Sequence, residues 1–482
     1  MLNYRFIGKV LGHILVALSM FMLVCAGVAF YYQENDLNAH LLSALICLLL
    51  GGMASWLWRN SGHELGRREG FIIVTIVWVI MSVFGSLPYL ISGTIPGFTN
   101  AFFETISGFT TTGASVVADI EALPHGILFW RSTTHLIGGM GIVVLAVAIL
   151  PYFGFGGMSL YNAEAAGISN EKLHPRMKQT ANILWRIYLV LILLETVFLV
   201  AGDMPLFDAL CHSFATIASG GFSTQNDSIA GYSPYIQYVI ILFMIFAGTN
   251  FALFYFVWKG KVNKLFSNRE FRVYLVVIAV VSAIVSITLV FLDHHNWESS
   301  VRVAFFQVVS LVTSTGFATA DYTAWHPYLT YLMFLLLFSG ACAGSTSGGI
   351  KIMRHSILFR NTILEFKRMV HPHAVIPLKV QDRTVAPDIV YKVMAFVILY
   401  LTIFSMGTFV LTFLGMDMDS AMGAAATTMG GIGPGIGSVG PVDNFSAVPE
   451  AGKWVLSSLM LLGRLELFTV LILFSPGFWK NI

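Results

Sequence analysis

The sequence is poor in charge. Only 11% of its 482 residues are charged, while 56% are hydrophobic. Because about a quarter of the residues in a soluble protein are charged, this chain has too little polar surface to cover a globule in water. Its formal net charge is only +2, whereas proteins that bind nucleic acid are typically strongly basic. These deficits favour a chain embedded in a lipid bilayer and exclude nucleic acid as an expected partner.

The sequence also has few cysteines and no recognisable catalytic motif. The four cysteines are scattered singly, without a CxxC or a His at ligand spacing, so neither a zinc site nor a structural disulfide is expected. The stretch GIGSVG at 435–440 satisfies GxGxxG, but Pro441 follows it and no strand precedes it, which argues against a nucleotide fold. Since no nucleophile–base pair or phosphate loop is found, we expect no enzyme activity and no covalent cofactor.

Long apolar runs are abundant. A run of roughly 20 residues can cross a bilayer as a helix. The first run continues past Lys9 to Tyr32 with no small-residue cleavage site after it, so it is predicted to be a span rather than a signal peptide. The sequence predicts an all-α polytopic membrane protein with ten transmembrane helices, near 7–32, 39–58, 70–92, 125–150, 180–202, 235–258, 271–292, 328–350, 388–415 and 454–476.

The distribution of Lys and Arg predicts the orientation. With a cytoplasmic N-terminus, nearly all of the 27 basic residues fall on or beside cytoplasmic segments, as the positive-inside rule requires. The exceptions are Arg131, Arg302, Lys453 and Arg464. The basic segment 351–383 is the largest predicted cytoplasmic surface, and either membrane anchoring or the docking of a partner fits it.

Four shorter apolar stretches lie between spans on the predicted outer side, at 98–109, 206–217, 302–312 and 419–429. Each would form a helix of roughly 17 Å, about half the thickness of the membrane. A half-membrane helix followed by a glycine-bearing strand and a second span predicts a re-entrant pore loop. Because each unit crosses the membrane twice, the four predicted repeats are parallel.

The strands after these helices can be aligned on one glycine each. The segments TTTG, ASGG, TSTG and GGIG place Gly113, Gly221, Gly316 and Gly433 in register, although GGIGPG departs from the pattern and leaves its register open by one or two residues. Four such strands around one axis can direct backbone carbonyls at a dehydrated cation. Ordinary extracellular turns are the alternative. The predicted filter residues are Thr111, Thr112, Gly113, Ser219, Gly220, Gly221, Ser314, Thr315, Gly316, Gly431, Ile432 and Gly433.

The apolar run at 328–350 is interrupted by SGACAGSTSGG at 339–349. Each glycine lowers helix propensity by about 1 kcal/mol relative to Ala, and Ser and Thr compete for backbone hydrogen bonds. Tight helix packing through small residues is the alternative. We expect an unwound loop below the filter that contains Gly340, Gly344, Ser345, Thr346, Ser347, Gly348 and Gly349.

A single charge, Arg464, lies near the middle of the last predicted span. A charge at that depth costs about 2.5–3.5 kcal/mol and usually faces a cavity or a partner. Glu466 lies on another face of the same helix and is not an intrahelical partner. An ion pair with Glu195 on another helix is the alternative to a position facing the pore.

With these motifs the whole chain resembles the TrkH/KtrB/HKT superfamily of potassium transporters, and its two extra N-terminal runs make it more similar to TrkH than to KtrB. The resemblance implies four covalently joined pore units, with the filter glycines at Gly113, Gly221, Gly316 and Gly433. It implies K⁺ as the transported ion, held at the filter residues only, since Gly113 stands where some sodium-preferring relatives have serine. It also implies a gating loop at 339–349 with Arg464 beside it.

The same resemblance implies a homodimer, a cytosolic TrkA-like nucleotide-binding regulatory ring and a place in the bacterial inner membrane. The expected division is two extra helices in 1–69 and pore repeats in 70–179, 180–270, 271–387 and 388–482, with the gating loop in the third. Passive, gated K⁺ uptake is the first hypothesis. A Na⁺- or H⁺-coupled symporter is the alternative, although inverted-repeat transporters need an odd number of crossings per repeat. A receptor or scaffold would leave the registered glycines unexplained.

Overall fold

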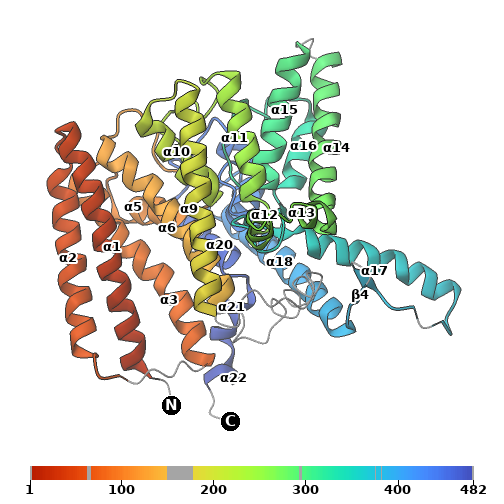
Figure 1. Ribbon diagram of the computed structural model, residues 1–482, viewed down its shortest axis with the longest axis horizontal. Helices are drawn as coiled ribbons and strands as arrows, with labels where there is room; N and C mark the ends of the chain where they lie inside the picture. Colours follow the sequence, from red (N-terminus) through yellow and green to blue (C-terminus); the bar gives the residue numbers. More distant parts are fainter. Residues whose placement is uncertain are drawn as a thin grey trace.

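The computed structural model describes residues 3–61, 67–148, 177–292, 296–374, 376–380 and 383–479. Its helices stand side by side, with α1 (Tyr4–Tyr32) and α2 (Leu37–Leu57) packed together at one edge (Figure 1). The last helix, α22 (Pro476–Trp479), lies at the same end of the molecule as the start of α1 (Figure 1). The predicted helical, multi-pass architecture is confirmed.

Six helices are long and apolar enough to cross a membrane, and the number rises to eight if each of two bent pairs is one span. The continuous ones are α1, α2, α3 (Arg67–Gly85) with α4 (Leu87–Ser92), α9 (Met177–Ala201), α14 (Arg269–Leu292) and α18 (Pro387–Phe413). The helices α6 (His125–Ala148) and α16 (Pro327–Leu336) occupy the other two predicted runs. The count of ten transmembrane helices stays a prediction.

Two predicted spans are bent. The first consists of α11 (Pro234–Ala247) and α12 (Phe251–Trp258), which meet at 101°. The second consists of α20 (Glu450–Arg464) followed by α21 (Phe468–Leu471), with a bend of 107°. At the first break Asn250 restarts the helix, because its side chain accepts a hydrogen bond from the N–H of Ala252 at 2.9 Å. At the second break Glu466 adopts a left-handed φ of 53°. At both places a hydropathy profile shows only a continuous apolar run.

The four predicted half-membrane helices are present as α5 (Phe98–Phe109), α10 (Leu206–Ala218), α15 (Trp297–Val312) and α19 (Met418–Gly430). The bounds of α5 are those predicted, whereas α15 begins at Trp297 rather than at 302. Its added first turn holds Glu298, which pairs with Arg302 at 2.8 Å across one helical turn. Helices α5, α10 and α15 lie in the half of the molecule away from the marked termini (Figure 1).

The chain after α16 leaves the helix at Leu336, inside the predicted run at 328–350. Strand β1 (Ser339–Gly340) pairs in parallel with β2 (Ile350–Lys351), so the segment between them forms a closed loop. Helix α17 (Ile352–Val370) then projects from the bundle (Figure 1). The remaining elements are α13 (Asn263–Ser267), the antiparallel pair β3 (Lys379–Val380) and β4 (Arg383–Thr384), η1 (Gly437–Val439) and η2 (Ile472–Phe474).

Candidate functional site: a glycine ring above an intramembrane loop

The four half-membrane helices end in the same backbone conformation. Each ends at a left-handed residue two positions before the registered glycine, namely Thr111, Ser219, Ser314 and Gly431, with φ of 52°, 56°, 52° and 64°. The next residue donates its N–H to the carbonyl five residues back. Thr112 donates to Ser107 at 2.8 Å, and Ile432 donates to Thr427 at 3.0 Å. This is the Schellman closure of a helix C-terminus. The fourth segment therefore has the backbone of the other three, although its sequence departs from theirs.

The registered glycines form a closed ring of contacts. All four have positive φ, at 80° for Gly113, 76° for Gly221, 83° for Gly316 and 99° for Gly433. A Cβ added to any of them would meet a backbone carbonyl of another strand: at Gly113 the oxygen of Gly220, at Gly221 that of Thr315, at Gly316 that of Ile432 and at Gly433 that of Thr112. Each of these carbonyls precedes another registered glycine, and the fourth strand contacts the first. Both the conformation and the space therefore require glycine.

The hydroxyl groups beside the ring are largely used within the protein. Thr112 shares a 2.8 Å hydrogen bond with Thr110, and Thr315 shares one of 2.8 Å with Thr313. The Oγ atoms of Ser219 and Ser314 are bonded to the loop described below. The groups left to face a central ion are therefore backbone carbonyls, which are the hard oxygen ligands suited to alkali cations.

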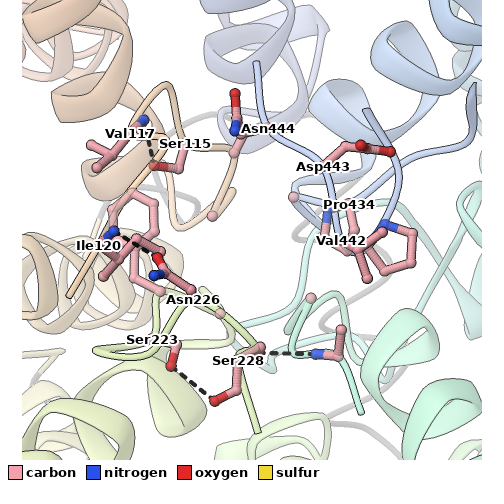
Figure 2. A pocket seen from close by; sticks show the side chains of 18 of the residues that line it. Ser115, Val117, Ile120, Ser223, Asn226, Ser228, Pro434, Val442, Asp443 and Asn444 are labelled. Atoms are coloured by element: carbon pink, nitrogen blue, oxygen red, sulfur yellow. Dashed lines mark hydrogen bonds between the residues drawn. The ribbon is translucent and has the colours of Figure 1, made fainter. Parts of the chain in front are cut away.

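A cavity of about 190 Å³ lies on the side of the ring where the strands continue. All four registered glycines line it, together with polar side chains that include Ser115, Asn226, Asp443 and Asn444. Figure 2 shows Ile120 and Asn226 next to each other among the lining residues, where the N–H of Ile120 donates to Asn226 Oδ1 at 2.7 Å. The cavity can hold hydrated cations next to the ring.

The loop between β1 and β2 packs against the opposite side of the ring, at the ends of three half-membrane helices. Thr346 Oγ1 and Ser219 Oγ are 2.8 Å apart, and the N–H of Gly348 donates to Ser314 Oγ at 2.6 Å. A Cβ on Gly348 would overlap the carbonyl oxygen of Gly430. The structure therefore places the predicted loop directly beneath three of the four glycine-bearing segments that follow the half-membrane helices.

Arg464 is the last residue of α20 and is only 7% exposed. Its guanidinium donates to the carbonyl oxygen of Thr346 in the loop at 2.8 Å and to that of Gly138 on α6 at 3.1 Å. These bonds replace the alternative of an ion pair with Glu195. Glu466, just beyond the break, instead pairs with Arg354 of α17 at 2.8 Å. Arg464 thus connects the loop to α6.

Two residues that hold the loop were not predicted from the sequence. Glu270, in the first turn of α14, accepts the N–H of Ala343 at 2.8 Å. Lys351 donates to the carbonyl and to the Oγ of Ser347, the latter at 2.9 Å. The signal in the sequence was weak, because a carboxylate just before the apolar run at 271–292 and a Lys just after the run at 328–350 both fit ordinary membrane anchoring.

The described part of the chain holds no group of three or more His, Cys, Asp or Glu side chains that could bind a metal ion. All four cysteines are buried as free thiols. The groups that converge at the ring and could bind an ion are backbone carbonyl oxygens.

Comparisons with known proteins find relatives along the whole chain. The model of the TrkH family, described as a cation transport protein, matches residues 37–480. The Trk system potassium uptake protein TrkH of Salmonella typhimurium (strain LT2) is 39% identical over all of both chains, and TrkI of Halomonas elongata is 34% identical over 98% of this chain and 96% of its own. The crystal structure of the potassium transporter TrkH from Vibrio parahaemolyticus superposes with a TM-score of 0.92 at 36% identity, covering 99% of this chain and 100% of that one.

Proposed function

Because this chain belongs to the TrkH family of cation transport proteins, we propose that it carries K⁺ into a bacterial cell across the inner membrane. Relatives named as potassium uptake proteins, alike over their full length, support this proposal. The closed ring of glycines and carbonyls is the observation that carries it. A dehydrated K⁺ needs a ring of oxygens in place of its water shell, and backbone carbonyls provide one.

The proposed filter consists of the twelve predicted residues at the ring. In this proposal the chain crosses the membrane ten times with a cytoplasmic N-terminus. The residues 1–69 form two extra helices, and the pore repeats are 70–179, 180–270, 271–387 and 388–482. The C-terminal ends of α5, α10, α15 and α19 direct partial negative charge at the ring, which favours a cation there.

The proposed gate is the loop that contains Gly340, Gly344, Ser345, Thr346, Ser347, Gly348 and Gly349, together with Arg464. Its contacts with Ser219 and Ser314 support a position in the path of an ion that has left the filter. The guanidinium of Arg464 adds a positive charge next to that path. An opening motion has to release the bonds of Thr346 and Gly348.

Coupled symport with Na⁺ or H⁺ is the second candidate function. The observation that favours it is the pair of broken helices, since such breaks form ion sites in secondary transporters. The parallel arrangement of the proposed repeats favours passive flow instead. A flux assay with and without a Na⁺ or pH gradient separates the two, because only a coupled transporter accumulates K⁺ against its own gradient.

We also propose that the chain forms a homodimer regulated by a cytosolic TrkA-like nucleotide-binding ring. The relatives are named as parts of a Trk system, which fits a transporter of several components. Helix α17 is the surface that supports this proposal. It projects from the bundle, and its exposed face carries large apolar side chains, namely Phe359, Ile363, Phe366, Met369 and Val370.

The direct test is ion flux in liposomes that contain only this chain. We expect K⁺ to pass faster than Na⁺ down matched gradients, with low flux until a regulatory partner is added. Empty liposomes and liposomes containing an unrelated membrane protein are the controls. No K⁺ flux with or without the partner, from a protein shown to be folded, would contradict the proposal.

A further inference from the structure

Arg131 of α6 is a buried charge that contacts two adjacent strands of the ring. Its side chain is 1% exposed, and its Nε donates to Glu104 of α5 at 2.9 Å. Its two terminal nitrogens donate to Ser115 Oγ and to the carbonyl oxygen of Ser223, both at 3.2 Å. The guanidinium also lies 4.2 Å from the ring centroid of Phe222, a cation–π contact.

These contacts connect the first strand to the second. Ser115 follows Gly113 by two positions, and Ser223 follows Gly221 by two positions, so the guanidinium bonds to equivalent points of neighbouring strands. Glu104 fixes the first strand as well, because its carboxylate accepts the N–H of Val116 and the hydroxyl of Ser115, both at 2.9 Å. The planar fork of an arginine can hold several acceptors at fixed angles.

The other strands have weaker versions of this support. Glu104 lies nine positions before Gly113. The residue nine positions before Gly221 is His212, which is bonded to Ser223 Oγ at 3.0 Å. The residue nine positions before Gly316 is Gln307, which donates to the carbonyl of Ala320. The fourth strand has Ala424 at this position. Of these four helix positions, only that of Glu104 takes part in a buried ion pair. The first and second strands are therefore joined through a buried ion pair, whose charge-assisted hydrogen bonds are stronger than bonds between neutral groups.

We propose that Arg131, held by Glu104, is a positioning residue that sets the spacing between the first two strands and so supports discrimination of K⁺ from Na⁺. This inference rests on the proposed function. K⁺ and Na⁺ differ in size, so a ring that can change its width loses selectivity before it loses conduction. Because the pair is neutral as a whole, it constrains the carbonyls without adding net charge beside the pathway.

The test compares K⁺ and Na⁺ flux through Arg131→Lys and Glu104→Asp in liposomes. Both variants keep the charges of the pair, whereas removing one partner of a buried pair costs about 3–5 kcal/mol and endangers folding. The single nitrogen of Lys cannot take the three positions from which the guanidinium nitrogens bond Glu104, Ser115 and Ser223. We therefore expect the K⁺/Na⁺ flux ratio of Arg131→Lys to fall by about tenfold, the effect of roughly 1.4 kcal/mol. Arg302→Lys is the matched control, since Arg302 also pairs with a Glu but lies away from the ring.

A wild-type ratio in folded Arg131→Lys, or an equal fall in the fluxes of both ions, would overturn the inference, because a merely structural role changes only the amount of working protein. Gly113→Ser separates this failure from failure of the proposed function. If Gly113→Ser lowers the ratio and Arg131→Lys leaves it unchanged, only the role of the pair is wrong. If the unmodified chain carries no K⁺ flux, the proposed function itself fails.

Discussion

At the scale of single residues, Gly113 illustrates why the ring tolerates no side chain. Its φ of 80° is unfavourable for other residues, and a Cβ there would overlap the carbonyl oxygen of Gly220. We expect Gly113→Ser to displace that carbonyl and to lower the K⁺/Na⁺ flux ratio, by about tenfold if the loss is near 1.4 kcal/mol. Flux of each ion in liposomes measures it. Gly97→Ser is the control, because Gly97 also has positive φ but open space around it. An unchanged ratio would remove Gly113 from the filter.

Arg464 belongs to the same scale, because it has a buried charge and donates a hydrogen bond to the carbonyl of Thr346. A guanidinium about 6 Å from a passing K⁺, at an effective dielectric near 20, repels the ion by about 2.8 kcal/mol. We therefore expect Arg464→Ala and Arg464→Gln to raise resting K⁺ flux by up to about a hundredfold, and Arg464→Lys to keep most of the barrier. Flux and thermal stability are measured together for the three variants. A stable Ala variant with wild-type flux would show that Arg464 is no barrier.

At the scale of elements, the loop between β1 and β2 is held by a few bonds to its neighbours. Deleting residues 345–348 removes the contacts of Thr346 and Gly348 with Ser219 and Ser314. We expect resting K⁺ flux to rise without any partner, since the residues that contact Ser219 and Ser314 beneath the ring are then gone. Unitary conductance and flux per folded molecule measure the change. A deletion variant that inserts normally and stays as closed as wild type would place the gate elsewhere.

The cap of α19 offers a test of the element that carries the fourth strand. Asp417 accepts the N–H of Ser420 at 3.0 Å, and this bond lowers the pKa of its carboxyl below the usual 3.8. We expect Asp417→Ala to cost about 1 kcal/mol of stability, seen as a lower melting temperature in detergent. Asp419→Ala, in the same first turn without the cap bond, should cost less.

The stabilisation by Asp417 should also depend on pH. Because its folded pKa is depressed, the contribution is complete above pH 3.8, begins to be lost below that value and disappears as the pH falls through the lowered folded pKa. The stability difference between wild type and Asp417→Ala should therefore be constant at neutral pH and should shrink in acid. A difference that grows in acid would contradict the assigned cap.

The elements also show what could be predicted from the sequence. The length of the apolar stretch predicted the bounds of α5, and the recurring glycines predicted the register of Gly113, Gly221 and Gly316. Both features are local in the sequence. The breaks at Asn250 and Glu466 could not be predicted, since each depends on one capping or left-handed residue inside an apolar run. The contacts of Arg131 with Glu104 and Ser223 were equally hidden, because they join residues far apart in the chain.

At the scale of the whole molecule, α17 presents an apolar face that nothing in the described chain covers. Phe359 and Phe366 are 70% and 66% exposed and lie about two helical turns apart on this projecting helix. We expect the double variant Phe359→Ser/Phe366→Ser to shift the proposed homodimer to a monomer in detergent, measured by light scattering. Phe413→Ser, at an equally exposed site on α18, should leave the dimer intact. A dimeric double variant would assign this face to the lipid surface instead.

The closure of the ring between Gly433 and Thr112 has a genetic consequence. Symmetric pores assembled from separate identical subunits receive every substitution in all copies at once. Here four different segments of one polypeptide meet in a circle, so one codon changes one quarter of the circle and leaves three quarters native. Each quarter is therefore free to diverge alone. The segment GGIGPG, which differs in sequence from its three counterparts but keeps their backbone conformation, is an example of one quarter that differs alone.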